Sequence, residues 1–207
     1  MRREDLKLYL VTDRVLARGR DISDIVREAV AGGVTMVQLR EKNISTREFV
    51  QLGCALKSIL LTSGVPLIIN DRVDVAMACD ADGVHIGQSD MPYAIARGML
   101  GPDKIIGLSV ESFGQIEEAN GLDVDYLGVS PVFATKTKTD TVSPFGLDGL
   151  KKAVLMSRHP LVGIGGMNIC TAADVKACGA DGIAVVSAIV GAEDPRRAAA
   201  ELLEVMR

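Results

Sequence analysis

The sequence contains no apolar run long enough to span a bilayer and no paired cysteine motif. Its longest apolar runs, such as 67–69 and 183–186, have the length of a buried strand. The first six residues, MRREDL, lack the apolar core of a signal peptide. The four cysteines form no C-x-x-C pair, so we expect free structural thiols. These absences predict a cytoplasmic protein that does not act on a membrane.

Common short motifs of enzymes are missing as well. There is no H-E-x-x-H metal motif and no Walker A sequence, and Asn168 stands where a dinucleotide fingerprint in segment 163–168 would have its third glycine. The two histidines are far apart in the chain. We expect His85 to pack or to form hydrogen bonds near a strand end, and His159 to lie in a surface loop. The net charge of −4 argues against a general nucleic-acid-binding protein.

What the sequence does contain is a regular alternation of short β-branched runs and longer amphipathic segments. Its 207 residues, 48% of them apolar, suit one domain with a substantial core. Continuous apolar runs are typical of strands buried on both faces of a parallel sheet. Eight such runs favour an α/β fold, a single-domain (β/α)8 TIM barrel over residues 1–207, rather than an open doubly wound sheet. The predicted strands are 8–11, 34–39, 66–69, 83–86, 104–108, 125–129, 161–164 and 182–186.

Helix signals lie between these strands. Asp21 is a predicted N-cap, Ser45 and Glu48 form a predicted capping box, and Pro195 after Asp194 suits the first turn of the last helix. Glycines recur just before three of the strands, in segments 31–34, 81–84 and 178–183. We interpret them as a weakly repeated turn in which glycine ends a helix.

Functional residues of such a barrel lie at the carboxyl ends of the strands, and those ends are polar here. Gln38, Arg40 and Lys42 alternate at the end of the second strand and would share one face, where an amide and two cations suit a polyanion. Asp71 and Asp90 follow the third and fourth strands, as the ligands of a Mg²⁺ site would. The alternatives are a solvated strand end for the first group, and helix N-caps or acids of a first helical turn for Asp71 and Asp90.

Three further segments extend this predicted site. Ser109 ends the fifth strand, where it can hydrogen-bond a ligand or cap a helix. The long connection at about 130–145 is predicted to be a mobile lid, and its TKTK run at 135–138 suits phosphate oxygens. The glycines at 165 and 166, with the end of the eighth strand, suit a second phosphate site. Two phosphate sites and a metal facing one cavity suggest joining two phosphorylated fragments or processing one bisphosphate.

At these residues, and over nearly its whole length, the chain resembles the thiamine-phosphate synthase (thiamine-phosphate pyrophosphorylase) family. Each matching segment is weak alone, but their order along the chain is highly specific. They are YLVTD at 9–13, VQLREK at 37–42, INDR at 69–72, DGVHIGQSD at 82–90, GPDKIIG at 101–107, TKTK at 135–138 and GIGG at 163–166.

The resemblance implies a transferase that couples 4-amino-5-hydroxymethyl-2-methylpyrimidine diphosphate with hydroxyethylthiazole phosphate, giving thiamine phosphate and pyrophosphate. It implies that Asp71 and Asp90 bind Mg²⁺, and that Arg40, Ser109 and Lys138 are catalytic. It also implies two groups of substrate-binding residues. Gln38, Arg40, Lys42, Asn70, Ser109 and Lys138 would bind the pyrimidine diphosphate, and Thr135, Thr137, Gly166, Val186 and Ser187 the thiazole phosphate.

Two other functions stay open on the sequence. One is a thiazole phosphate tautomerase of the same fold, which would not need the full diphosphate and Mg²⁺ set. The other is a non-catalytic sensor of a phosphorylated ligand, which would bind without turnover. The sequence does not determine the oligomeric state and is compatible with a homo-oligomer.

Overall fold

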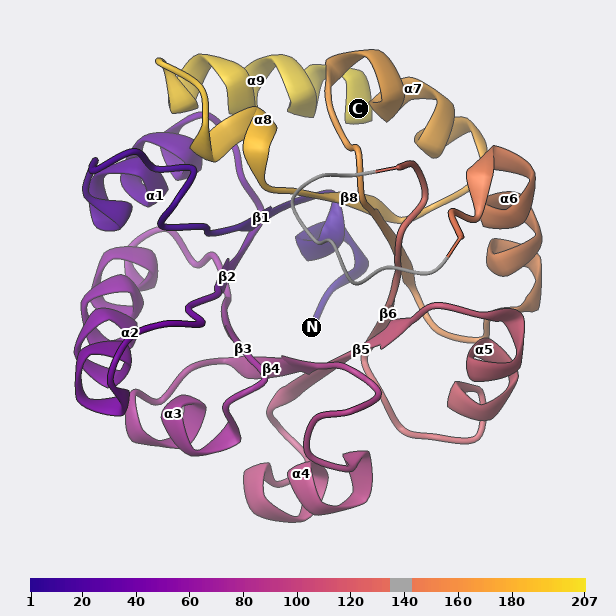
Figure 1. Cartoon of the computed structure of the whole chain (residues 1–207), viewed down its shortest axis with the longest axis horizontal. Coiled ribbons are helices and arrows are strands. Elements are labelled where there is room, and N and C mark those ends of the chain that lie inside the picture. The colour runs from indigo at the N-terminus through magenta and orange to yellow at the C-terminus, as the bar shows by residue number, and fades with distance from the viewer. Residues whose placement is uncertain (135–142) are drawn as a thin grey trace.

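The computed structural model describes residues 1–134 and 143–207, and they form a closed barrel of eight parallel strands (Figure 1). Strand β8 pairs with β1, which closes the sheet, so the predicted (β/α)8 barrel is confirmed and the open sheet is wrong. The strands are β1 Leu8–Val11, β2 Met36–Leu39, β3 Leu67–Asn70, β4 Gly83–Ile86, β5 Ile105–Val110, β6 Tyr126–Val129, β7 Leu161–Ile164 and β8 Gly182–Val185.

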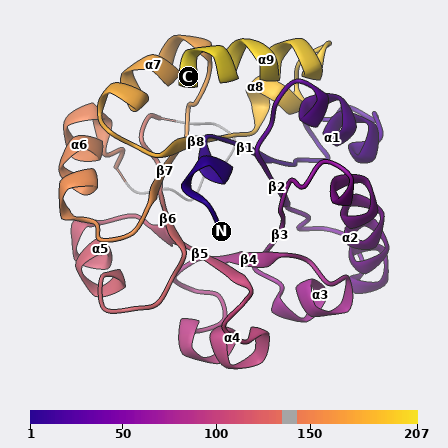
Figure 2. The same ribbon diagram turned by 180° about the vertical axis from the view of Figure 1, so that it is seen from behind.

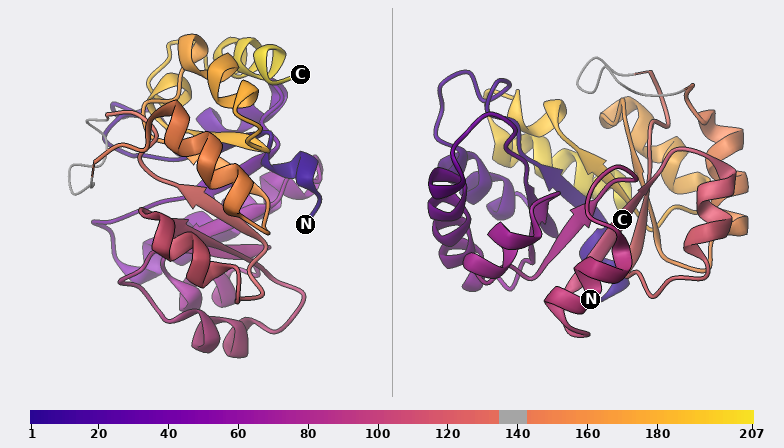
Figure 3. Two further views of the ribbon diagram at one scale, coloured as in Figure 1. Left: turned by 90° about the vertical axis from the view of Figure 1, so that its right-hand side faces the viewer. Right: turned by 60° about the horizontal axis from the view of Figure 1, so that its bottom comes forward.

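Helices follow the strands and pack around the outside of the barrel, as two side views show (Figure 3). Among the described residues, none of these helices has both the length and the apolar character needed to cross a bilayer. They are α1 Ile22–Ala31, α2 Thr46–Leu61, α3 Val73–Ala78, α4 Tyr93–Leu100, α5 Phe113–Ala119, α6 Gly146–Met156, α7 Ile169–Ala177, α8 Ser187–Val190 and α9 Pro195–Met206.

The strands are buried because they separate two apolar layers. Alternate residues of a strand point to opposite faces, so Leu8 and Leu10 of β1 pack outward against the helices while Tyr9 and Val11 pack inside the barrel. A short 3-10 helix, η1 (Arg3–Leu6), adds the fully buried Leu6 to the inner layer. The N-terminus lies over the centre of the barrel when the molecule is seen from behind (Figure 2). The inner core is thus covered at the amino end of the strands.

The predicted helix starts are confirmed. Asp21 accepts a hydrogen bond from the Ser23 amide at the start of α1, and Asp194 caps α9, which opens with Pro195. Ser45 and Glu48 form the predicted reciprocal capping box of α2. These caps satisfy amides that the first helical turn leaves without a partner, so each start is encoded locally.

The interpretation that glycine ends the helix before these strands is only partly right. Gly32 is the C-cap of α1, and Gly179, with a φ of 89°, directly follows the C-cap of α7. Gly83 and Gly182, in contrast, are the first residues of β4 and β8. A Cβ atom at Gly83 would meet the Ile105 carbonyl oxygen at 2.1 Å, and one at Gly182 would meet the Leu6 carbonyl oxygen at 1.8 Å. These two glycines are therefore required by close backbone approach rather than by a helix end.

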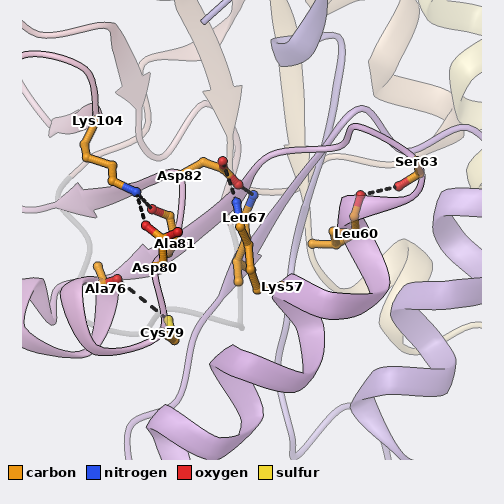
Figure 4. A network of polar contacts seen from close by, with 10 residues as sticks. All are labelled: Lys57, Leu60, Ser63, Leu67, Ala76, Cys79, Asp80, Ala81, Asp82 and Lys104. Carbon is orange, nitrogen blue, oxygen red and sulfur yellow. Dashed lines mark hydrogen bonds and ion pairs between the residues drawn. The ribbon is translucent and has the colours of Figure 1, made fainter.

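A repeated polar contact does exist between neighbouring strands, and it is formed by the residue directly before β2, β4, β6 and β8. We call this contact the junction. Each even-numbered strand is directly preceded by a residue whose side chain accepts a hydrogen bond from a backbone amide. That amide belongs to the first or second residue of the preceding odd-numbered strand. Figure 4 shows the junction at Asp82, where the carboxylate also contacts Lys57 at 2.7 Å. The four amide–side chain pairs are Leu8–Thr35 (2.9 Å), Leu67–Asp82 (2.8 Å), Ile106–Asp125 (2.9 Å) and Leu161–Asp181 (2.8 Å).

This junction predicts a stability effect at Asp125. Its carboxylate accepts from the Ile106 amide and pairs with Arg97 at 3.1 Å, so Asp125→Ala leaves an amide and a largely buried cation without this partner. We expect a loss of about 2 kcal/mol in the free energy of unfolding, measured by urea denaturation. Asp103→Ala, an exposed carboxylate nearby in the chain, is the control and should change it little. An equal effect of both substitutions would contradict the role of the junction.

Candidate active site

A cavity of about 510 Å³ opens at the carboxyl ends of the strands. All the predicted site residues that the structure describes line this cavity, and they come from six of the eight strand ends. Thr135, Thr137 and Lys138 lie outside the described residues, as does the middle of the predicted lid, residues 135–142. The predicted residues in the cavity wall are Gln38, Arg40, Lys42, Asn70, Asp71, Asp90, Ser109, Gly166, Val186 and Ser187.

The end of β2 contributes the amide and the two cations. Gln38 is buried, whereas the Arg40 and Lys42 side chains are 27% and 51% exposed. Lys42 contacts Asp71 at 2.5 Å, and Arg40 forms a long ion pair of 3.7 Å with Asp13. All three side chains line one cavity, as expected of residues that share one face of the strand. The two cations add positive charge to the mouth of the cavity.

Asp71 and Asp90 form a carboxylate pair beside these cations. Asp71 has a positive φ of 61°, a conformation that aspartate tolerates better than most residues. Asp90 accepts from the Gly87 amide at 2.7 Å. Burial raises the pKa of the Asp90 carboxyl, and the neighbouring Asp71 raises this pKa further. Neither acid is an N-cap, because Arg72 and Pro92 occupy those positions of α3 and α4.

A cation between these acids would relieve the repulsion of two like charges in a partly buried place. Within the described residues, no group of three or more His, Cys, Asp or Glu side chains is gathered as a metal cage would need. Two carboxylates, completed by water and substrate phosphate, are nevertheless a donor set that suits Mg²⁺.

The loop after β7 forms the opposite wall. Gly165 and Gly166 have φ values of 99° and 70°. A Cβ atom on them would approach Pro131 at 2.9 Å and Phe133 at 2.8 Å, so the loop after β6 packs directly on these glycines. The Gly166 carbonyl also accepts hydrogen bonds from Asn168 and Thr171, which hold the loop in place. The glycines therefore have a packing role that the sequence did not reveal.

The floor of the cavity is a chain of hydrogen bonds that sequence reasoning missed. Gln38 Nε2 donates to the Tyr9 hydroxyl at 2.7 Å, and the Tyr9 and Tyr126 hydroxyls lie 2.8 Å apart. His85 places Nδ1 3.0 Å from the Tyr126 hydroxyl and Nε2 2.8 Å from Ser109 Oγ. Hydrogen bonding of His85 near a strand end is thus confirmed. Inward-facing tyrosines on apolar strands were the available signal, since a buried hydroxyl needs a partner.

Glu111, Gln88 and Ser89 also line the cavity and were not anticipated. Gln88 donates from Nε2 to the Ser109 carbonyl at 2.7 Å, and thereby links the loop after β4 to β5. The strand β5 runs to Val110, two residues beyond its predicted end, because Ser109 and Val110 pair with Gly128 and Val129 of β6. Ser109 is therefore held by strand pairing rather than by a free loop.

Known proteins of one family are similar to nearly the whole chain. A family model described as thiamine monophosphate synthase matches residues 8–189. The chain is 52% identical to a thiamine-phosphate synthase of Albidiferax ferrireducens over 206 residues, covering 100% of this chain and 94% of that protein. It is 53% identical to a thiamine-phosphate synthase of Vibrio campbellii, covering 97% and 98%.

A solved structure gives the same result at the level of the fold. The thiamine phosphate pyrophosphorylase from Pyrococcus furiosus superposes with a TM-score of 0.90 at 43% identity, covering 99% of this chain and 96% of that one. The match thus includes the strand ends that build the cavity, as well as the barrel. The chain therefore belongs to the thiamine monophosphate synthase family and is an enzyme of the transferase class.

Proposed function

We propose that this enzyme couples 4-amino-5-hydroxymethyl-2-methylpyrimidine diphosphate with hydroxyethylthiazole phosphate, releasing pyrophosphate and forming thiamine phosphate. The observation that carries the proposal is the position of Asp71 and Asp90 beside Arg40 and Lys42 in one cavity. Two acids and two cations together suit a diphosphate that arrives with a divalent metal.

The proposed residue roles follow the two sides of the cavity. On one side, Gln38, Arg40, Lys42 and Asn70, with Lys138 from the loop after β6, would bind the pyrimidine diphosphate, and Ser109 would contact it from β5. On the other side, Gly166, Val186 and Ser187, with Thr135 and Thr137, would bind the thiazole phosphate. The glycine backbone and the Ser187 hydroxyl offer donors to phosphate oxygens.

Asp71 and Asp90 would hold Mg²⁺. When bound there, the ion supplies positive charge that stabilises departing pyrophosphate. Lys42 contacts Asp71 at 2.5 Å, so the lysine and the metal site share one carboxylate. The Arg40 and Lys42 side chains could both reach the phosphate oxygens that bind the metal. Neither side chain is fully buried, and so each can turn toward the substrate.

The reaction would proceed by loss of the leaving group before attack. The C–O bond between the pyrimidine methylene and the diphosphate breaks, the electron pair leaves with pyrophosphate, and a pyrimidine carbocation remains. The thiazole nitrogen then donates its lone pair to the methylene carbon. Arg40 and Lys138 would stabilise the charge of the leaving group, and Ser109 would orient the pyrimidine. No protein nucleophile is needed, and the lid would exclude water from the cation.

The test is to supply both phosphorylated substrates together and each one alone, and to identify the products by mass spectrometry. We expect thiamine phosphate and pyrophosphate in equal amounts, only when both substrates are present. Conversion of a thiazole phosphate tautomer without coupling would instead support the tautomerase. Binding of either substrate without any product would support the sensor.

Lys138→Ala gives a second test within the predicted lid. If Lys138 stabilises departing pyrophosphate, the single-turnover rate should fall about a hundredfold with saturating substrates. Lys136→Ala removes a neighbouring positive charge from the same run and is the control. An unchanged single-turnover rate in Lys138→Ala would place this lysine outside the site.

Cytoplasmic location, the absence of a nucleic-acid or membrane partner and assembly into a homo-oligomer stay predictions. Size-exclusion chromatography with light scattering measures the last of these directly.

A further inference from the structure

Two buried tyrosines, Tyr9 and Tyr126, form the floor of the cavity. Tyr9 and Tyr126 are 1% and 0% exposed, and their rings meet edge to face with centroids 5.8 Å apart. Burial raises the pKa of both phenols, so both keep their protons. Each hydroxyl therefore has one hydrogen to donate.

Two glycines make room for this arrangement. A Cβ atom at Gly107 would lie 2.3 Å from the Tyr126 hydroxyl oxygen, and one at Gly128 would lie 3.1 Å from the His85 ring. The His85 and Tyr126 rings stack with centroids 5.5 Å apart. The position of His85 between Tyr126 and Ser109 is thus set by packing on several sides.

Counting donors gives the chain of hydrogen bonds a direction. Because Gln38 Nε2 donates to the Tyr9 oxygen, the Tyr9 hydrogen is free to donate, and among the described residues Tyr126 is the remaining hydrogen-bond partner of that hydroxyl. Tyr126 then accepts from Tyr9 and donates its own hydrogen to His85 Nδ1. If Nδ1 carried a proton, in the other tautomer or in imidazolium, it would donate to Tyr126, and one of the two buried phenol hydrogens would then lack an acceptor among these partners. An unpaired buried donor is costly.

We propose that His85 is a positioning residue: the chain Gln38–Tyr9–Tyr126 holds its ring in the Nε2–H tautomer, so that His85 donates to Ser109 Oγ and Ser109 presents its own O–H to the cavity. Ser109 lines the cavity, and its hydroxyl would then meet an acceptor atom of the pyrimidine diphosphate. The inference rests on the proposed function, since it adds to the role given there to Ser109.

The first test does not depend on activity. The chain has only two histidines, so ¹⁵N-histidine NMR of the wild type and of His159→Gln assigns both rings. We expect the His85 proton on Nε2, and a mixture of tautomers in Tyr126→Phe. A proton on Nδ1 in the wild type would overturn the inference. The arrangement that then pairs every donor would have the Gln38 amide turned around and each hydrogen bond between these side chains reversed.

The second test measures coupling between His85 and Ser109. His85→Leu should lower kcat/KM for the pyrimidine diphosphate about tenfold, the effect of one hydrogen bond, and His85→Gln, which keeps an N–H near Ser109, should recover part of it. When Ser109 is already replaced by alanine, adding His85→Leu should lower kcat/KM by less than about twofold. Equal effects of His85→Leu in both backgrounds would overturn the positioning role.

Two tyrosine variants test the same inference without a substitution at His85, so the test still works if His85 variants fail to fold. Tyr126→Phe removes the donor to Nδ1 and should lower kcat/KM about tenfold. Tyr93→Phe removes a hydroxyl that donates to the Asp123 carbonyl on an outer helix, and should leave kcat/KM unchanged. Equal kcat/KM values for the two variants would overturn the inference. A wild type with no coupling activity would defeat the proposed function, while the NMR result would still report the tautomer.

Discussion

Replacing both Asp71 and Asp90 by alanine is expected to abolish Mg²⁺-dependent coupling and to leave the barrel folded. If the two carboxylates hold Mg²⁺ in this cavity, as we propose, their removal takes away the metal and its charge from the leaving group. We expect kcat/KM to fall at least about 10³-fold. Mg²⁺ should raise the Tm of the wild type by ligand binding and have no such effect on the double variant.

The structure explains why the fold should survive. Lys42, which loses Asp71, is half exposed and can be solvated, and the burial that disfavours the Asp90 charge no longer costs stability. The control is the double variant Asp74→Ala, Asp80→Ala. It removes two exposed acids that lie between β3 and β4 and do not line the cavity. Full coupling activity in the Asp71/Asp90 double variant would contradict the metal site.

Gly107→Ala is expected to disrupt the cavity floor, although it adds only one methyl group. Its Cβ atom would lie 2.1 Å from Tyr126 Cζ, and the Tyr126 ring is fully buried and cannot swing into solvent. The ring must move against the core, so we expect a loss of about 3 kcal/mol in the free energy of unfolding, measured by urea denaturation. Coupling activity should fall too, because the shift takes Tyr126 away from His85.

Gly98→Ala is the matched control for this prediction. Gly98 lies within α4, where an added Cβ would meet nothing within 4 Å. There the same substitution should stabilise the protein by about 0.5–1 kcal/mol, because alanine is the better helix former. The two glycine variants should therefore differ in sign. Equal stability of Gly107→Ala and the wild type would mean that Tyr126 has more freedom than its burial indicates.

Much of the fold was predictable because its signals are local. Continuous apolar runs identify strands buried on both faces, and the capping residues at Asp21, Ser45 and Asp194 identify helix starts. The junction at Asp125 was not predictable, since its partner Ile106 belongs to the preceding strand and lies across the helix α5 in the chain. Gly83 looked like a helix end, but its role depends on Ile105, which pairing brings close.

The same distinction applies to the site. A general rule puts functional side chains at the carboxyl ends of barrel strands, and it located Gln38, Asp71 and Asp90 correctly in the cavity. The hydrogen-bonded floor could not be predicted this way. Tyr9 and Tyr126 are 117 positions apart in the chain, and only closure of the barrel brings their hydroxyls within 2.8 Å.

The most direct test of the account is one coupling assay in which metal-free enzyme receives both phosphorylated substrates and Mg²⁺ is then titrated in. Pyrophosphate and thiamine phosphate should appear together, in equal amounts, and only as Mg²⁺ is added. Equal product formation with a chelator present would contradict the role of Asp71 and Asp90. Absence of both products from folded enzyme at saturating Mg²⁺ would contradict the coupling reaction itself.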